Sequence, residues 1–160
     1  MKESSDSSND SPGVLVFPPL LFGSALILGL VLHFLVPLRV HLPALPARAA
    51  GLVLLVGGAL LAKWGEKTLH GAGTNVNPGK PTTAIVVNGP FRYSRNPLYL
   101  AVTSVYAGVS LLIPAVWPLL LLVVVLIVLQ WGVIAREERY LDRKFGEQYR
   151  EYRTQVRRWL

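Results

Sequence analysis

Two arginines stand beside a helix-start signal in residues 89–99, which read Gly-Pro-Phe-Arg-Tyr-Ser-Arg-Asn-Pro-Leu-Tyr. Asn96 is a residue type that caps helices and Pro97 suits the first helical position, so we expect a helix to begin here. The first turn of a helix leaves N–H groups unpaired and carries partial positive charge, which Arg92 and Arg95 would reinforce. This junction predicts a binding site for an anionic group. The alternative is that its arginines and tyrosine only anchor a membrane helix among lipid headgroups.

A pair of carboxylates, Glu137 and Glu138, is the second group that could do chemistry. Glu138 interrupts an otherwise apolar helical stripe, and a carboxylate in such a place needs a partner because burying it unpaired is costly. One interpretation pairs the carboxylates with arginines. The other has them hold a cationic or hydroxyl-bearing ligand that enters from the cytoplasm. The candidate arginines are Arg92, Arg95, Arg136 and Arg139.

The histidines and glycines offer weaker candidates. Gly71 and Gly73 would let a backbone approach a ligand closely, although helix ends also use glycine for steric reasons alone. His70 lies at the same predicted helix end and could touch a ligand. Because His33 and His41 are scattered and the chain has no cysteine, no metal site is predicted. No nucleophile, base and orienting residue form a recognisable set, so covalent hydrolysis has little support.

The elements that must position these residues are membrane helices. Apolar residues are gathered into four long runs, so we expect an all-α, multi-pass transmembrane bundle, with the third run short for a full crossing. A single domain over residues 14–160 follows a disordered tail at 1–13. The four expected spans cover about 14–38, 47–69, 97–113 and 116–135, with a loop at 70–96 between the second and the third.

An amphipathic interfacial helix is expected over residues 136–159, after the last span. Its apolar side would face lipid or the bundle, and arginines crowd its other sides. The predicted C-terminal helix therefore lies along the membrane surface. Its stripe, at steps of three and four residues, comprises Ile134, Glu138, Leu141, Phe145, Tyr149, Tyr152, Val156 and Trp159.

Lysine and arginine are concentrated around the loop at 70–96 and after the last span. Cytoplasmic flanks carry the excess of these residues, so both segments, and with them both termini, are predicted on the cytoplasmic side. The net charge of +7 lies beside membrane spans and among acidic residues. Anionic lipid headgroups are therefore the expected partner of the basic residues, rather than nucleic acid.

A polar stripe runs along the third predicted span. Tyr99, Thr103, Tyr106 and Ser110 follow one another at steps of four, three and four residues, so they share one face of the helix. One interpretation makes this face the wall of a substrate cleft. The other gives it hydrogen bonds between helices and no ligand.

Small residues predict faces where helices approach closely. Gly58 and Ala62 lie four residues apart on the second predicted span, and Ser104 and Gly108 on the third. Such spacing lets helix backbones come close together within a membrane.

Several of these motifs together resemble one family, the isoprenylcysteine carboxyl methyltransferase and phospholipid methyltransferase group of integral-membrane enzymes. The resemblance covers residues 70–160, and the combination is more specific than any single motif. The motifs are Ala72-Gly73-Thr74, residues 89–99, Glu137-Glu138, Phe145-Gly146-x-x-Tyr149-x-x-Tyr152 and Val156-x-Arg158-Trp159.

This resemblance implies methyl transfer from S-adenosylmethionine, bound on the cytoplasmic side, to a lipophilic acceptor that arrives from the bilayer. An arginine and a helix start would hold the carboxylate of the cofactor, and a glutamate would hold its ammonium or ribose hydroxyls. By similarity, Arg95, Asn96, Pro97 and Tyr99 match the cofactor motif of the family, Glu137 and Glu138 match its acidic pair, and Gly71 and Gly73 correspond loosely to a glycine motif.

Asn96 stands where the isoprenylcysteine branch of the family usually has histidine. The resemblance therefore favours a phospholipid-like branch over the methylation of a prenylated protein. Asparagine does not act as a general base at neutral pH, whereas histidine can. Methyl transfer from a sulfonium depends mainly on alignment and desolvation, so an acceptor that is already deprotonated suffices.

The leading hypothesis is an S-adenosylmethionine-dependent methyltransferase whose acceptor is a membrane-partitioned carboxylate, thiol or amine. The alternatives are an NADPH-dependent sterol or lipid reductase and a non-catalytic adaptor that binds anionic lipid. The sequence does not indicate an oligomeric state. The expected catalytic residues are Arg95, Asn96, Tyr99 and Glu138; the cofactor contacts add His70, Gly71, Gly73, Arg92, Pro97 and Glu137; and the substrate contacts are Thr103, Tyr106 and Ser110.

Overall fold

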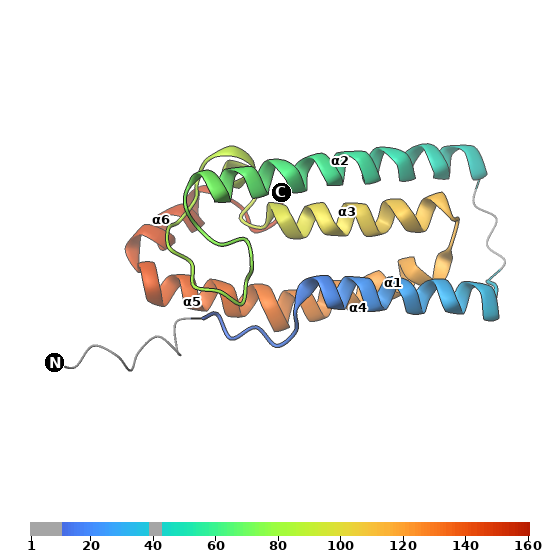
Figure 1. The fold of residues 1–160 in the computed structure, drawn as a ribbon, viewed down its shortest axis with the longest axis horizontal. Helices are drawn as coiled ribbons and strands as arrows, with labels where there is room; N and C mark the ends of the chain where they lie inside the picture. Colours follow the sequence, from blue (N-terminus) through green and yellow to red (C-terminus); the bar gives the residue numbers. More distant parts are fainter. Residues whose placement is uncertain (1–10, 39–42) are drawn as a thin grey trace.

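In the computed structural model, residues 11–38 and 43–160 are described, and the regular elements within them are all helical. Most of the tail expected at 1–13 lies outside the described residues, as does His41. The longer helices run lengthwise along the molecule, and the C-terminal helices lie at one end of it (Figure 1). The helices are α1 (Pro18–Leu35), α2 (Ala44–Gly71), α3 (Pro97–Leu112), α4 (Val116–Leu129), α5 (Ala135–Phe145) and α6 (Glu147–Gln155).

Three helices are long and apolar enough to cross a membrane: α1, α2 and the continuous helical stretch Val116–Phe145. The fourth expected span, α3, has 16 residues. At 1.5 Å per residue it is about 24 Å long, whereas the hydrocarbon core of a bilayer is about 30 Å thick. The structure thus supports three of the four predicted crossings by length, and a full crossing by α3 stays a prediction.

Glycines bring α2 and α3 into close contact. A Cβ atom on Gly51 would lie 2.8 Å from the Gly108 carbonyl oxygen, and one on Gly58 would lie 2.8 Å from that of Ala101. In the other direction, a Cβ on Gly108 would lie 2.7 Å from the carbonyl oxygen of Gly51. The close-packing faces predicted at Gly58 and Gly108 are therefore the contact between these two helices, which fixes the end of α2 beside the start of α3.

The main apolar core lies between α1, α3 and α4. The rings of Phe22 and Tyr106 meet edge to face with their centroids 6.0 Å apart. The Tyr106 hydroxyl donates a 3.0 Å hydrogen bond to the carbonyl oxygen of Pro118, so its polar atom is satisfied within the core. This core supports the polar end of α3. Its buried members are Phe22, Tyr106, Val125, Leu129, Val133 and Ile134.

A π-helical turn, η2 (Gln130–Ile134), joins α4 to α5. Such a turn bonds residues five apart instead of four, so it rotates the side chains that follow relative to those that precede it. The carbonyl oxygen of Gly132 accepts a 3.1 Å hydrogen bond from the Leu15 N–H, which ties the segment before α1 to this turn. Turns of this kind are frequent near functional sites, and this one directly precedes Glu137.

The C-terminal region differs from the single helix predicted over 136–159. Gly146 has φ +54° and ψ −123°, a conformation that residues with a Cβ rarely adopt, and it separates α5 from α6. Beyond Gln155 the chain is extended, with Val156 at φ −123° and ψ 130°. The chain therefore turns back on itself, and its C-terminus lies near the start of α3 (Figure 1).

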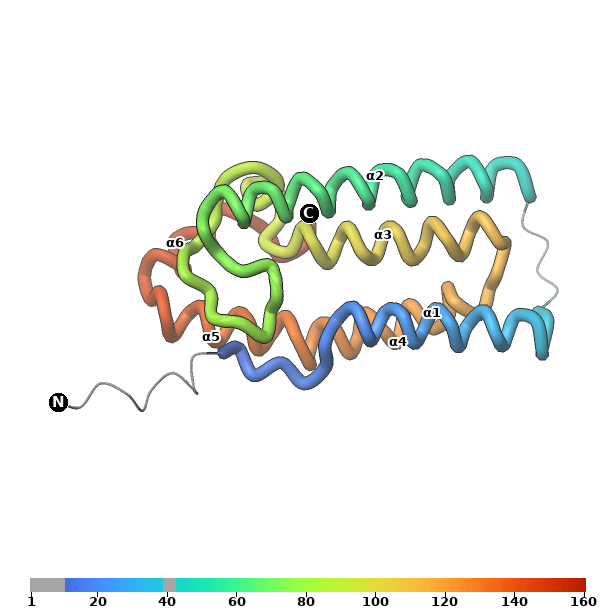
Figure 2. Tube along the Cα trace, in the orientation of Figure 1, coloured from blue at the N-terminus to red at the C-terminus, as the bar shows by residue number. Residues whose placement is uncertain are grey.

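The long loop between α2 and α3 passes over the same end of the bundle. Figure 2 traces it from the end of α2 across to α5 and back to α3. It is tied to α5 by a 3.3 Å hydrogen bond from the Thr82 N–H to the Tyr140 hydroxyl. Before α3 it contains a 3₁₀ turn, η1 (Gly89–Arg92). The loop and the two short helices together enclose the polar end of the molecule.

Candidate active site

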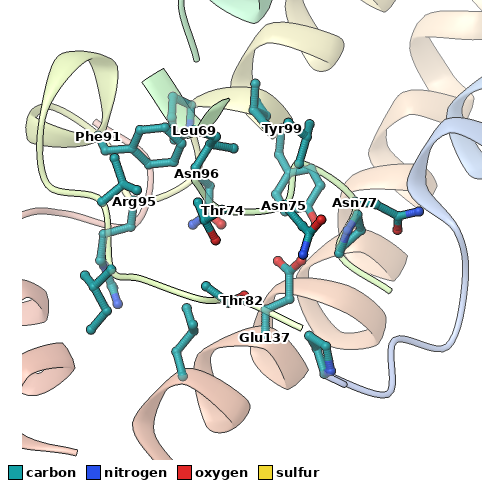
Figure 3. Close-up of a pocket in the computed structure, with 18 of the residues that line it drawn as sticks. Leu69, Thr74, Asn75, Asn77, Thr82, Phe91, Arg95, Asn96, Tyr99 and Glu137 are labelled. Atoms are coloured by element: carbon teal, nitrogen blue, oxygen red, sulfur yellow. The ribbon is translucent and has the colours of Figure 1, made fainter. Parts of the chain in front are cut away.

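A cavity of about 300 Å³ lies where the end of α2, the long loop, the start of α3 and the helices α5 and α6 meet. This volume is at the lower end of the range for small-molecule sites. Figure 3 shows labelled side chains from α2, the long loop, the start of α3 and α5 arranged around the opening. Among the predicted site residues, Arg95, Asn96, Pro97, Tyr99, Glu137 and Glu138 line it.

Arg95 reaches the cavity from the loop that precedes α3. Its Nη1 lies 3.0 Å from Glu138 Oε1 and donates a 3.2 Å hydrogen bond to the Tyr149 hydroxyl. The side chain is 10% exposed, and its buried Nε has no hydrogen-bond partner. A guanidinium in this state retains a donor for an incoming oxygen, and a carboxylate is the group that its geometry suits best.

Glu138 lies between two arginines. Its Oε1 forms an ion pair with Arg95 Nη1 at 3.0 Å and accepts a 2.9 Å hydrogen bond from Arg158 Nε, while its Oε2 accepts one at 2.6 Å from Arg158 Nη2. The interpretation that pairs the carboxylates with arginines thus describes Glu138. Arg95 was among the candidate partners, but Arg158 was not. Both Glu138 oxygens are occupied, so this residue holds Arg95 in place.

Glu137 is the carboxylate with capacity left. Its Oε1 accepts a 2.8 Å hydrogen bond from the Tyr99 hydroxyl, and Tyr99 is its one hydrogen-bond partner among the described residues. Glu137 lies two residues beyond Ala135, where the last apolar run ends. The pKa of Glu137 is raised to about 7, mainly by loss of hydration in this position; the hydrogen bond from Tyr99 lowers it, and the charge of Glu138 adds to the rise.

Asn96 occupies the N-cap position of α3, and Pro97 follows in the first turn, as predicted. The side chain of Asn96 makes no capping hydrogen bond; its Nδ2 instead donates a 3.0 Å bond to the carbonyl oxygen of Arg158. The predicted helix start is therefore confirmed, although the Asn96 side chain does not cap it. The Asn96 N–H bonds to the hydroxyl of Ser94 at 3.1 Å, and Ser94 is buried.

The residues predicted at the end of α2 lie outside the cavity lining. Gly73 has φ +68° and allows the turn after the helix, in which the Thr74 N–H bonds to the Leu69 carbonyl oxygen at 3.1 Å. Thr74 and Leu69 line the cavity, whereas His70, Gly71 and Gly73 are not part of its lining. The steric interpretation thus accounts for these glycines. In residues 11–38 and 43–160, no three histidine or acidic side chains are grouped to hold a metal ion.

Arg92 also lies outside the cavity lining. Its guanidinium is 5.2 Å from the centre of the exposed Tyr93 ring, and that ring is 6.4 Å from the ring of Trp64. A cation beside exposed aromatic rings is typical of the membrane–water interface. The headgroup-anchor interpretation therefore suits Arg92, while Arg95 belongs to the cavity.

The polar stripe on α3 divides in a similar way. Tyr99 lines the cavity, but Thr103, Tyr106 and Ser110 are not part of the lining. The Ser110 hydroxyl donates a 2.7 Å bond to the carbonyl oxygen of Tyr106, whose own hydroxyl is bonded across to α4. The Thr103 hydroxyl is buried without a partner. Hydrogen bonding between helices therefore describes Tyr106, whereas Ser110 bonds within α3 and Thr103 fits neither interpretation.

Two tyrosines of α6 complete the site. Tyr149 and Tyr152 are buried and line the cavity, and the Tyr152 hydroxyl donates a 2.7 Å bond to the carbonyl oxygen of Phe91. Burial raises the pKa of both hydroxyls, so they stay protonated and act as donors at neutral pH. The sequence analysis placed both residues on an apolar stripe and did not include them among the site residues. Their three-residue spacing, which puts both on one face of a helix, was the signal that could have indicated their contribution.

Comparison with known proteins identifies a related family. The phospholipid methyltransferase family matches residues 46–148, which is more than half of the chain. An uncharacterized protein of Haemophilus influenzae is 50% identical over 38 residues, which make up 24% of this chain and 60% of that protein. The chain therefore spans less than two thirds of that relative. No solved structure matches.

Proposed function

Because this chain belongs to the phospholipid methyltransferase family, we propose that it transfers a methyl group from S-adenosylmethionine to a lipophilic acceptor in a membrane. The observation that carries the proposal is the pairing of two unsatisfied groups on one cavity. Arg95 has a buried donor without a partner, and Glu137 has an acceptor oxygen left. A ligand with both an anionic and a cationic group matches that arrangement.

The residues present fit the cofactor. Arg95 would hold its carboxylate, and Glu137 would accept hydrogen bonds from its ammonium group or ribose hydroxyls. When bound, S-adenosylmethionine supplies a methyl group that is activated by its attachment to a positively charged sulfur. The hydroxyl of Tyr149, which stays protonated, would offer a hydrogen-bond donor on the wall of the cavity, whereas that of Tyr152 donates to the Phe91 carbonyl oxygen.

The protein contributes mainly by positioning and by excluding water. Glu138 fixes the guanidinium of Arg95, and Tyr99 fixes the carboxylate of Glu137. Asn96 holds the C-terminal backbone through its side chain and is proposed to act through that contact instead of as a base. Groups held in place before the reaction lower its barrier without proton transfer. The acceptor is therefore proposed to arrive deprotonated.

A lipophilic acceptor suits the remaining walls. Ala62, Leu69 and Val102 line the cavity from α2 and α3, and both helices continue as apolar elements away from it. An acceptor with an apolar tail would lie along these helices with its reactive group in the cavity. The excess of lysine and arginine at this end of the molecule favours the cytoplasmic side for the site.

Labelled methyl transfer tests the proposal. The protein in lipid nanodiscs is incubated with a lipid extract and methyl-labelled S-adenosylmethionine, and mass spectrometry follows the label. We expect a labelled lipophilic product that Arg95→Gln and Glu137→Gln reduce strongly. Arg143→Gln, at an exposed α5 position outside the cavity lining, should leave the yield unchanged.

Two outcomes would contradict it. Thermal protection by NADPH, with none by S-adenosylmethionine, would favour a membrane reductase. Binding of anionic lipid with no response to either cofactor would favour an adaptor. Both measurements use the protein that was prepared for the transfer assay, so its folded state is known.

A further inference from the structure

The last five residues form a segment that the family match does not include. Residues 156–160, here called the C-terminal strap, follow α6 and run back to the start of α3, whereas the match ends at residue 148. The Arg157 carbonyl oxygen accepts a 3.0 Å hydrogen bond from the Arg95 N–H. The Arg158 carbonyl oxygen accepts bonds from Ser94 Oγ at 3.2 Å and from Asn96 Nδ2 at 3.0 Å. The strap therefore holds the backbone on both sides of Arg95.

The side chain of Arg158 reaches across to α5. Its Nε and Nη2 donate to Glu138 Oε1 and Oε2 at 2.9 and 2.6 Å, the two-point geometry that binds a carboxylate most firmly. The Glu138 side chain is 13% exposed, so little solvent competes for its oxygens. One residue thus joins the start of α3 through its backbone and α5 through its side chain.

This arrangement determines which N–H donors of Arg95 stay without a partner. Because Arg158 takes both oxygens of Glu138, Arg95 shares one oxygen through Nη1, and its buried Nε stays without a partner. A largely enclosed carboxylate that lost Arg158 would be driven to its other cation by the cost of being left unpaired. A two-point pair between Glu138 and Arg95 would then use the donors that a ligand needs.

We propose that Arg158 is a positioning residue that keeps Arg95 open for the carboxylate of the ligand: it holds both oxygens of Glu138, so that Glu138 contacts Arg95 through Nη1 alone. This inference rests on the proposed function, because S-adenosylmethionine is the ligand whose carboxylate Arg95 would bind. It assigns the C-terminal strap a part in the site that lies outside the family match.

A pair of variants tests the inference by calorimetry with S-adenosylmethionine. Arg158→Gln should weaken binding by about tenfold or more, the scale of a lost hydrogen bond to a charged group. Adding Glu138→Gln to it should restore part of the affinity, because the neutral amide does not compete for Arg95. If Arg158 had a merely structural role, the second substitution in its contact with Glu138 would weaken binding of S-adenosylmethionine further.

Arg143→Gln is the matched control. Its side chain is exposed on α5 and lies outside both the strap and the cavity lining, so binding should equal that of the wild type. In a transfer assay, Arg158→Gln should raise KM for the cofactor and change kcat less than twofold or so, because Arg158 touches no reacting group. If Arg158→Gln does not fold, Arg158→Lys, which can hold one oxygen firmly, should bind with intermediate affinity.

The outcomes separate this inference from the proposed function. Wild-type protein that binds no S-adenosylmethionine would remove the proposed function and this inference with it. Wild-type binding that Arg158→Gln leaves unchanged would overturn the inference alone. So would a folded double variant that binds no better than Arg158→Gln.

Discussion

The hydroxyl of Tyr99 donates a 2.8 Å hydrogen bond to Glu137 Oε1 and so joins the first turn of α3 to α5 across the cavity wall. This bond lowers the pKa of Glu137, but loss of hydration outweighs it, and the pKa is raised to about 7. A carboxylate with that pKa changes charge within the physiological range. A change of pH near neutrality therefore changes the charge of Glu137 and its capacity to accept hydrogen bonds.

Binding of S-adenosylmethionine should strengthen as the pH rises from 6 to 8. Protonated Glu137 is neutral and accepts fewer hydrogen bonds. Below pH 7 the affinity should therefore rise by about tenfold for each unit of pH. Glu137→Gln should bind weakly with little pH dependence. Glu147→Gln, at an exposed position on α6, should follow the wild type. Calorimetry at pH 6, 7 and 8 measures this, and an equal slope in Glu137→Gln would assign the titration to another group.

The protonation of Glu137 should also change the stability of the protein. Between the usual pKa of 4.5 and the raised value of about 7, folded protein holds a proton on Glu137 that unfolded protein has released. The free energy of unfolding should therefore fall as pH rises through this window, and Glu137→Gln should remove that decrease. Thermal unfolding in detergent across the window measures the slope. A fall of the same size in the glutamine variant would contradict the assignment.

Tyr99→Phe should move the titration to higher pH. The Tyr99 hydrogen bond stabilises the charged form of Glu137, so its loss raises the pKa of Glu137 further. The midpoint of the pH dependence of cofactor binding should shift upward, while the affinity at high pH changes less. A midpoint that stayed in place or moved downward would show that Tyr99 does not support the carboxylate.

Local patterns in the sequence were enough to predict the helical character of the chain and the helix start at Pro97, and they left the contact of Arg95 with Glu138 as one of several possible pairings. The helix start at Pro97 has a local signal, and the apolar runs have a length that few other structures explain. The resemblance to a known family brought the arginine and the carboxylate into one site. Each of these features depends on residue types close together in the sequence or on a recognisable motif.

The two features that escaped prediction depend on the path of the chain. The reversal at Gly146 divides the expected C-terminal helix, and a glycine within an amphipathic pattern does not show by itself that its φ is positive. The contacts of the strap with Arg95 and Asn96 use backbone carbonyl oxygens, which every residue has. Nothing in the sequence therefore distinguished Arg158 as the partner of Glu138 from the arginines that are nearer to Glu138 in the sequence.

Gly108→Ala should destabilise the contact between α2 and α3. A Cβ there would lie 2.7 Å from the Leu55 nitrogen as well as from the Gly51 carbonyl oxygen, and backbone atoms yield little. We expect a loss of about 1–3 kcal/mol in the free energy of unfolding. Gly57→Ala is the control, because its Cβ would meet nothing within 4 Å. It should be neutral or stabilising by up to about 1 kcal/mol. Equal unfolding temperatures for the two variants would contradict this account of the packing.

Gly146→Ala should act through conformation alone. No atom lies within 4 Å of the added Cβ, but φ is +54°, so the substitution should cost about 1–3 kcal/mol and disturb the placement of α6. Because Tyr149 bonds to Arg95, weaker binding of S-adenosylmethionine should accompany the lower stability. Gly23→Ala, on α1 with open space around it, should change neither quantity much. Full stability in Gly146→Ala would mean that the reversal is not needed.

The central claim is that S-adenosylmethionine binds between Arg95 and Glu137. Calorimetry of the purified protein at pH 8 tests it most directly, with thermal unfolding as the check on folding. We predict saturable binding at one site in the wild type and in Arg143→Gln, weakened by about 10- to 100-fold in Arg95→Gln and in Glu137→Gln. Folded wild-type protein that gives no heat of binding, or variants that bind as tightly as the wild type, would contradict the claim.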